Sequence, residues 1–517
     1  MGTKAYSNAL DLLTFTRASG GTALRRIGYG SELVSNGTFD ADTTGWTPYG
    51  SAVLSVVSQR LKVLGSGTSF PQAVEAVTIQ AGKVYAVSVD FDRDGSTSRV
   101  YLSLGKTATN VEYGQVSSTA ATGTLTSLVV ATTSVLYISL VAAGSTDHAY
   151  FDNVSVKEVL FDRASDPLVL FNHPNNIPRI EYAADGAVKG LLIEEQRTNL
   201  LTYSEDFANA AWTAGALNLT SISANRITPN TTLGQHRYDR TTTISASAHT
   251  FSVEAKPDGY SFLWLRLGAI NGTFNLDTGE VTLSSGGTAS SVAVGGGYFR
   301  VSISGTAAGN DTARINVLPT ASTADFSGDG TSGVLVRNAQ LEAGSFPTSY
   351  IPTSGAAATR SADVASIPTS AFGYNQKAGT VVVDSQHADY GGFDHAIFSL
   401  GDLTQNEEVY LAVAPDPDDA VFYVRSNNTT EASYFWNAQW AANTYAKIAV
   451  AFSEDDVEFA KDGTAVGLDT SATMPVGLTT LKMGERSNGV FKGAIHLKSI
   501  QYFPRRLTNA QLVRLTT

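Results

Sequence analysis

The chain of 517 residues contains no cysteine, three methionines and seven histidines, and charged residues make up only 16% of it. The lack of cysteine excludes disulfides, thiolate metal sites and thiol nucleophiles, so buried apolar area and strand pairing must hold the fold together. No stretch reaches the roughly 18–20 consecutive apolar residues of a transmembrane helix, so we expect no membrane insertion. Residues 1–7 lack the charged and then apolar pattern of a secretory signal, and none is expected.

Basic charge is also scarce. The chain has 35 basic and 47 acidic residues, which gives a formal net charge of −12. Nucleic-acid binding depends on clustered lysines and arginines that neutralise phosphates, so this balance argues against a nucleic-acid partner. The few histidines and methionines leave little for transition-metal chemistry, and no organic cofactor is expected.

Glycine, serine and threonine are abundant, with 47 glycines among short apolar stretches that alternate with polar residues. This composition predicts an all-β fold with many turns. A chain of this length exceeds what one hydrophobic core supports, so three or four domains are expected.

Two stretches, 32–160 and 199–344, repeat each other. Both open on a phenylalanine and a Trp-Thr pair, Phe39 with Trp46 and Phe207 with Trp212. Further on, residues 88–95 align without gaps to residues 252–259, and a strand follows each, with Leu102 aligned to Leu265. Three matches in the same order predict two copies of one β-sandwich module.

The remaining C-terminal segment, 371–517, reads as a third sandwich. Short apolar strands and Asp-Gly or Asn-Gly turns run through it. Only residues 508–515 have a helical pattern, with Thr508 as the predicted N-cap.

Several strings resemble the signature of tailed-phage head-spike and tail-fibre proteins, and together they cover roughly residues 161–367. They are Ile-Pro-Arg-Ile-Glu-Tyr at 177–182, Gly-Leu-Leu-Ile-Glu-Glu-Gln-Arg-Thr-Asn-Leu at 190–200, the segment 340–352 with Phe-Pro-Thr-Ser-Tyr-Ile-Pro, and Thr-Arg-Ser-Ala-Asp at 359–363. The resemblance implies a structural protein on the virion surface, assembled in the host cytoplasm, that contacts glycans during host attachment. It does not imply catalysis.

Residues 33–39 and 152–156 look like the ends of a jelly-roll carbohydrate-binding module. The third sandwich is similar to concanavalin-like laminin-G domains, and residues 459–463 and 494–503 carry this resemblance. The fold class expected is therefore all-β, with tandem jelly-roll β-sandwiches followed by a concanavalin-like β-sandwich. The domains expected are an N-terminal anchor segment at 1–31, a jelly-roll module at 32–160, an ordered connector at 161–198, a second jelly-roll module at 199–344, a linker at 345–370 and the third sandwich at 371–517.

Strand alternation predicts a binding face on the second module. In residues 260–267 the leucines at 263, 265 and 267 share one side, which turns Phe262, Trp264 and Arg266 to the other. In the first module the same argument turns Arg99 and Tyr101 outward.

On the preceding strands Val89 and Val253 face the core, so Asp90 and Glu254 are expected to point outward at matching positions. An exposed aromatic beside a carboxylate and an arginine suits a sugar, because the ring stacks on its apolar face and the charged groups bond its hydroxyls. The alternative is that these side chains pack under a connector or another subunit.

The third sandwich offers two further candidates. Trp436 and Trp440 belong to an aromatic cluster on a segment between strands, which predicts either a ligand site or burial. Glu454, Asp456 and Glu458 have the E-x-D-x-E spacing that retaining glycosidases of concanavalin-like fold use on one strand. Residues 454–456 fall between two predicted strands, however, and this favours an ordinary hairpin tip.

A structural calcium is predicted near Asp152, from the position of that residue in the jelly-roll resemblance and because calcium prefers several oxygen ligands. The aligned position in the second module is near Asn338, which weakens the site there. His387 and His395 bracket Asp389 and Asp394 without any known metal spacing.

The function expected is that of a phage spike or fibre subunit that binds host cell-surface polysaccharide, without enzymatic activity. The alternatives are a polysaccharide depolymerase and a purely structural collar or decoration protein. Residues 1–31 are expected to bind other virion proteins. A homo-oligomer, on the resemblance a trimer, is also expected.

Overall fold

The computed structural model describes residues 12–67, 70–213, 215–223, 225–388, 395–414, 419–436 and 440–517. Its described part consists of β-sandwiches, with two short α-helices, α1 (Ala210–Thr213) and α2 (Asn509–Thr516). The all-β prediction is confirmed. None of the described helices is long and apolar enough to span a membrane. The chain divides into two compact units, residues 26–167 and residues 1–25 with 168–517.

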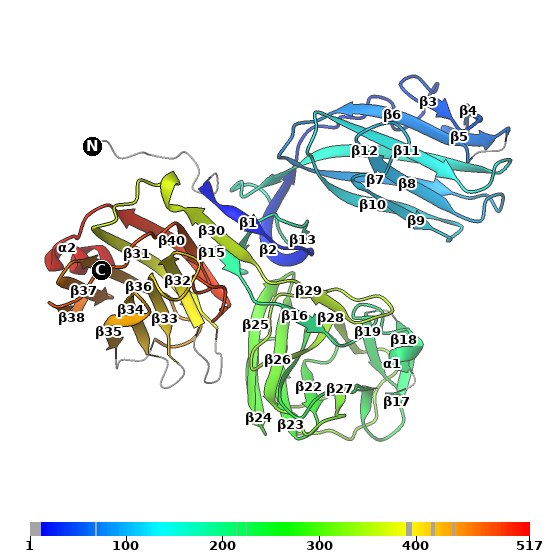
Figure 1. Cartoon of the computed structure of the whole chain (residues 1–517). Helices are drawn as coiled ribbons and strands as arrows, with labels where there is room; N and C mark the ends of the chain where they lie inside the picture. The colour runs from blue at the N-terminus through cyan, green and yellow to red at the C-terminus, as the bar shows by residue number, and fades with distance from the viewer. Residues whose placement is uncertain are drawn as a thin grey trace. The chain divides into compact units, whose positions relative to one another are not determined.

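The unit of residues 26–167 is one sandwich of two antiparallel sheets (Figure 1). Valines 87 and 89 of one sheet and Leu102 and Leu104 of the other are buried because each strand alternates apolar and polar residues. The first sheet has the order β3 (Thr47–Tyr49), β6 (Gln72–Thr78), β11 (Val135–Ala142), β8 (Val100–Gly105) and β9 (Gly114–Ser118). The second has the order β10 (Thr122–Val130), β7 (Val84–Asp92), β12 (His148–Phe161), β5 (Arg60–Gly65) and β4 (Ala52–Val57).

The second unit contains a sandwich with matching strand orders. One sheet runs β17 (Ala216–Leu217), β20 (His236–Thr241), β27 (Thr312–Leu318), β22 (Phe262–Leu267), β23 (Ile270–Asn275) and β24 (Glu280–Ser285). The other runs β18 (Leu219–Ser223), β19 (Arg226–Pro229), β28 (Gly333–Ala343), β21 (Ala248–Asp258), β26 (Tyr298–Thr306) and β25 (Thr288–Gly295). In this order β8 corresponds to β22, β7 to β21 and β12 to β28, which confirms the predicted duplication.

A β-bulge recurs at the same place in both copies. The register of β12 against β7 shifts between Asp152 and Ser155, and that of β28 against β21 shifts beside Arg337. Asn153 and Asn338 lie at these shifts with φ of 49° and 55°. Asparagine tolerates this left-handed conformation better than most residues, which explains why it stands at both bulges.

The C-terminal sandwich takes strands from well outside 371–517. Its first sheet has the order β1 (Thr14–Thr16), β30 (Val364–Pro368), β39 (Thr480–Met483), β32 (His395–Gly401), β33 (Glu408–Val413), β34 (Ala420–Ser426) and β35 (Thr429–Trp436). Its second has the order β14 (Arg179–Tyr182), β15 (Val188–Ile193), β40 (Ile495–Phe503), β31 (Ala378–His387), β36 (Ala446–Ser453), β37 (Asp456–Lys461) and β38 (Thr464–Asp469). Helix α2 begins at Thr508, whose capping box with Gln511 confirms the predicted N-cap.

This architecture corrects the role expected for the N-terminal segment and the two connectors. Phe15 of β1 is 7% exposed and belongs to the core of the C-terminal sandwich, together with Leu191 and Ala365. Residues 14–16 are therefore part of the chain's own fold. The connectors are ordered, as expected, because their strands β15 and β30 pair with β40 and β39.

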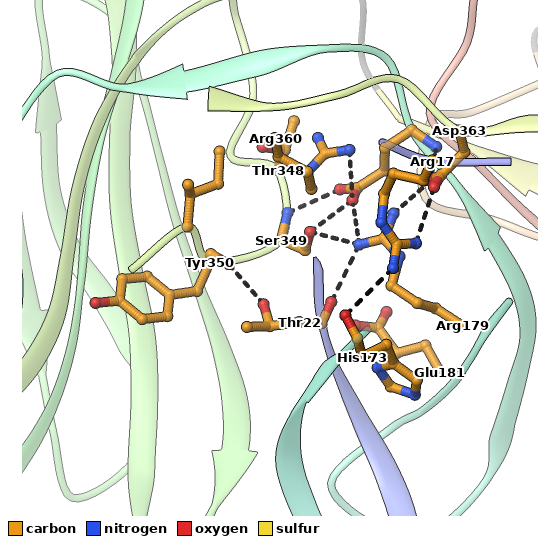
Figure 2. A network of polar contacts seen from close by, with 12 residues as sticks. Arg17, Thr22, His173, Arg179, Glu181, Thr348, Ser349, Tyr350, Arg360 and Asp363 are labelled. Carbon is orange, nitrogen blue, oxygen red and sulfur yellow. Dashed lines mark hydrogen bonds and ion pairs between the residues drawn. The ribbon is translucent and has the colours of Figure 1, made fainter. Parts of the chain in front are cut away.

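A buried network of charges joins the connectors within this unit (Figure 2). Arg17 Nη1 lies 3.1 Å from Asp363 Oδ1, and Arg179 donates to the other oxygen of the same carboxylate. Arg179 Nη1 is also 2.8 Å from Glu194 Oε2, and Glu194 accepts hydrogen bonds from the backbone and hydroxyl of Ser349 at 2.7 and 2.6 Å. The network residues at 179, 194, 349 and 363 all lie in the strings that resemble phage spike proteins.

Candidate functional site

Strand β22 of the second sandwich presents Trp264 on its outer face. Leu263, Leu265 and Leu267 have no exposed surface, whereas Phe262, Trp264 and Arg266 are partly exposed. The alternation predicted from the sequence is therefore confirmed for this strand. Trp264 pairs with Thr273 on β23 and with Asn316 on β27, which places it in the middle of the sheet.

Trp264 forms part of a hollow of about 350 Å³ on this face. Asn316, beside it, is fully buried; its Oδ1 accepts from the backbone of His236 at 3.1 Å, while its Nδ2 has no hydrogen-bond partner within the described residues. An aromatic wall beside polar groups suits a polar ligand with apolar faces. The hollow is lined by Trp264, Asn271, Thr273, Leu283, Ser285, Leu318, Ala321, Ser322 and Ala324.

Charged side chains occupy the row of paired residues next to that of Trp264. Arg266 pairs in register with Asn271 and with Arg314, and Arg314 pairs with Asp239. Asp239 accepts two hydrogen bonds from Arg314, at 2.7 and 3.0 Å, and one from Arg237 at 2.9 Å. The Nε of Arg266 donates to the backbone oxygen of Gly268 at 2.7 Å.

The first sandwich carries a related face on the equivalent sheet. Tyr101 on β8 is partly exposed and occupies the position of Trp264, since Leu102 aligns with Leu265. The register places Tyr49, Gln72, Val141 and Tyr101 in one row across four strands.

Tyr137 and Ser139 stand on the same face as this row. The Ser139 hydroxyl and Gln72 Oε1 are buried, and neither has a hydrogen-bond partner in the described part of the chain. The sequence reasoning found Tyr101 but missed Tyr49, Gln72 and Tyr137. Alternation in 135–142, where Leu136, Ile138 and Leu140 are buried, could have found Tyr137.

The predicted partnership of these aromatics with Asp90 and Glu254 is wrong. Both acids lie on β7 and β21, which belong to the opposite sheet of their sandwiches, so their side chains face away from Tyr101 and Trp264. Glu254 is also 3% exposed and forms an ion pair of 2.8 Å with Arg337. Arg99 is exposed one residue before β8, at the rim of the tyrosine face.

Asp90 instead lies in a polar depression on the other sheet of the first sandwich, which also includes Asp152. Asp90 accepts from Asn153 Nδ2 at 2.9 Å and from Thr124 at 2.5 Å. Partial burial raises the pKa of Asp152, and the charges of Asp90 and Asp40 add to this, against a hydrogen bond from the Asn153 backbone. In the second sandwich the equivalent pair is Glu254 and Arg337, which neutralise each other.

No group of three or more His, Cys, Asp or Glu side chains that could hold a metal occurs within the ranges the structure describes. The calcium near Asp152 therefore stays a prediction, which would need backbone or amide oxygens to complete its ligands.

The tryptophan site expected in the C-terminal sandwich is wrong for Trp440. This side chain is 1% exposed, donates to the Thr444 backbone oxygen at 3.0 Å and packs against His387. The side chain of Trp436, at the end of β35, lies outside what the structure describes. His387 and His395 are buried with ring centroids 4.9 Å apart, and Asp389 and Asp394 lie outside the described residues.

The acidic string of the same sandwich is a hairpin tip, as predicted. Glu454 and Asp455 form the turn between β36 and β37, and Asp455 has a φ of 54°. Asp456 pairs with Arg506 at 2.7 Å, and Glu458 is 2% exposed and accepts from Asn509 at 2.7 Å. These carboxylates are engaged in local pairing.

Comparisons with known proteins agree with a binding module at the N-terminal side. Residues 31–134 match the family model described as "Carbohydrate binding domain". No curated protein sequence matches the chain.

Similar solved structures include the carbohydrate-binding module CBM40 of a Ruminococcus gnavus sialidase bound to sialyllactose (13% identity, 28% of this chain, 84% of that one, TM-score 0.25). A tandem CBM22 structure from Paenibacillus barcinonensis has 13% identity over 61% of this chain and 97% of that one, with a TM-score of 0.23. Domains LG4-5 of the mouse laminin α1 chain have 12% identity over 57% and 92%, with a TM-score of 0.19. Identities this low concern the sandwich fold alone.

Proposed function

We propose that this protein is a glycan-binding surface subunit of a tailed-phage particle that contributes to host attachment. The observation that carries the glycan part is the pair Tyr101 and Trp264, which stand at equivalent outward positions in two copies of one sandwich. The first copy is also the one that matches a carbohydrate-binding family, over residues 31–134.

The chemistry of both faces suits a sugar. A pyranose ring has an apolar face that stacks on an aromatic ring and hydroxyls that need hydrogen-bond partners. In the first sandwich the partly exposed Gln72 stands in the row of Tyr101, and in the second Asn271, Thr273 and Ser285 line the hollow beside Trp264.

Weak sites become effective when many copies act together. Two shallow faces per chain and several chains per spike would raise the overall affinity by avidity rather than by new contacts. The homo-oligomer that this requires, a trimer on the sequence resemblance, is part of the proposal. Light scattering of the intact chain measures it directly.

The virion location is supported by the strings between residues 161 and 367 that resemble head-spike and tail-fibre proteins. Gold-labelled antibody against the chain should decorate the surface of purified particles in electron micrographs. We also propose binding without cleavage, because Asp456 and Glu458 of the acidic string are engaged by Arg506 and Asn509. Incubation of host polysaccharide with the protein should release no new reducing ends.

Glycan binding is tested with Tyr101→Ala, Trp264→Ala and the double variant in a polysaccharide-array and host-cell binding assay. Each single variant should weaken binding, and the double variant should abolish it. Tyr29→Ala is the matched control, since Tyr29 is 52% exposed and stands on neither face. Full binding by the double variant would refute the assignment of the site.

A further inference from the structure

The two aromatic faces differ in charge, position by position. Three positions that are neutral on the first face are arginines on the second: Gln72 becomes Arg237, Ser103 becomes Arg266 and Ser139 becomes Arg314. A fourth change, Val74 to Asp239, introduces one carboxylate, and Val141 becomes Asn316 without a change in charge. Both sandwiches keep the aromatic residue, Tyr101 or Trp264, in the middle of the face.

The three arginines of the second face are not equally engaged. Asp239 binds Arg314 through both of its oxygens and also accepts from Arg237. Arg266 has no ion pair among the described residues, and only its Nε hydrogen bond to Gly268 is defined. Because Arg266 follows Trp264 by two residues on the same strand, its guanidinium lies on the same face as the tryptophan.

Asp311 and Asp325 are two further acids on segments next to β22 and β27. The carboxylate of Asp311 lies close to Gly268 and accepts from the backbone of Ala308 at 2.9 Å. Asp325 is exposed on the segment that follows Leu318. Leu318 pairs with Phe262, and Phe262 lies at the opposite end of β22 from Arg266. The rows of Trp264 and Arg266 together thus hold Arg237, Arg266 and Arg314, against Asp239 within them and Asp311 nearby, and the face keeps a positive charge.

We infer that the second sandwich selects an acidic glycan, whose sugar ring stacks on Trp264 while a carboxylate of the same or the next residue binds Arg266. The first face is neutral at these three positions and carries Arg99 at its rim, so it should discriminate less between acidic and uncharged glycans. A hexuronate or sialate residue has the required chemistry, a pyranose ring with a carboxylate at its edge. This inference rests on the proposed glycan-binding function.

The experiment uses the full chain with Tyr101→Ala, so that the second face is measured alone. Its probes are polygalacturonate, the same polymer with its carboxylates reduced to alcohols, a polysialate and the neutral polymers dextran and galactan. We expect at least one acidic polymer to bind about tenfold more tightly than the neutral ones at low salt, the size of effect expected of one charge-assisted contact. The preference should shrink in 0.5 M NaCl because the contact is solvent-accessible.

Arg266→Gln in the same background should reduce the preference for the acidic polymer to about twofold or less. Trp264→Ala should abolish binding to the acidic and the neutral polymers alike. Arg505→Gln removes an exposed arginine from another sandwich and should change nothing, which controls for net charge. Equal binding of acidic and neutral polymers, or a preference that survives Arg266→Gln, overturns the inference and leaves glycan binding intact. Binding to no polymer, also without the Tyr101 substitution, contradicts the proposed function itself.

Discussion

Arg179 and Asp363, 184 residues apart in the sequence, form a fully buried ion pair in the unit that contains both connectors. Asp363 binds Arg17 with its other oxygen, so one carboxylate neutralises two guanidinium groups that have no exposed surface. Three distant segments are thereby fixed to one another through a single side chain. The geometry of the C-terminal sandwich depends on this contact, since β1, β14 and β30 begin or end beside it.

Asp363→Asn should be strongly destabilising. It keeps the shape of the side chain but leaves Arg17 and Arg179 without their shared counter-charge, and breaking a buried pair costs about 3–5 kcal/mol. Urea unfolding of the full chain at pH 7 measures the loss. Asp277→Asn, at an exposed turn, is the matched control and should change the free energy of unfolding by less than about 0.5 kcal/mol. Equal effects of the two substitutions would contradict the role of the network.

The network also makes stability depend on pH through Glu194. Burial alone would raise the pKa of this carboxyl, but the charges of Arg360 and Arg179 and the hydrogen bonds from Ser349 outweigh burial and lower the pKa to about 2. A folded-state pKa below the ordinary value of 4.5 contributes stability that is complete above about pH 4.5 and is lost as the pH falls towards 2. The contribution is on the order of 3 kcal/mol.

Comparing Glu194→Gln with the unmodified chain isolates this effect from the other acids. The difference in unfolding free energy between the two proteins should be largest at pH 7 and should shrink by pH 3, because only the unmodified chain loses the charged carboxylate. A difference that stays constant between pH 7 and pH 3 would show that the Glu194 carboxylate does not carry the pH dependence.

The position of Phe15 predicts that the N-terminal segment stabilises the C-terminal sandwich. Phe15→Ala removes a buried ring from that core and should cost about 3–5 kcal/mol. Its neighbour Thr14 is exposed on the same short strand, so Thr14→Ala should be nearly neutral. Differential scanning calorimetry should show the transition of this unit at lower temperature for Phe15→Ala alone. An unchanged transition would show that Phe15 does not stabilise this sandwich, as expected if residues 1–31 served solely to bind other virion proteins.

Strand alternation predicted well which side chains face the core. It predicted poorly which of the two sheets of a sandwich each strand joins. Alternation assigned Leu263, Leu265 and Trp264 correctly, because period two is fixed by strand geometry. It could not assign Glu254 to the right face, since consecutive strands of a sandwich often belong to different sheets and alternation within one strand does not say which.

The pairing of strands that are far apart in the sequence could not be predicted either. Strand β1 has three residues, pairs with β30 about 350 residues away and has no periodic signal of its own. For Trp440, on a segment between strand candidates, the sequence left a ligand site and burial both open; the indole donates to the Thr444 backbone oxygen inside the core. Composition therefore predicted the fold class, but not which segments complete each sandwich.

The last prediction contrasts two tryptophans of the second sandwich. Trp212 has no exposed surface, donates to the Tyr203 backbone oxygen at 2.9 Å and packs against Phe207 at 4.8 Å between ring centroids. Trp212→Ala should therefore cost about 3–5 kcal/mol and lower the melting temperature whatever the ligand. Trp264 is partly exposed on the outer face, so Trp264→Ala should leave the transition nearly unchanged and remove binding to the glycan that the second face selects.

Fluorescence of the Trp264 indole adds a readout that separates the two roles. A sugar that stacks on this ring should shift its emission and protect it from the quencher acrylamide, and both effects should vanish in Trp264→Phe, whereas the melting temperature stays the same. If Trp264→Ala instead destabilised the chain as much as Trp212→Ala does, the outer face would be an element of packing between subunits. The proposed second glycan site would then be wrong, and Tyr101 would remain as the aromatic to test.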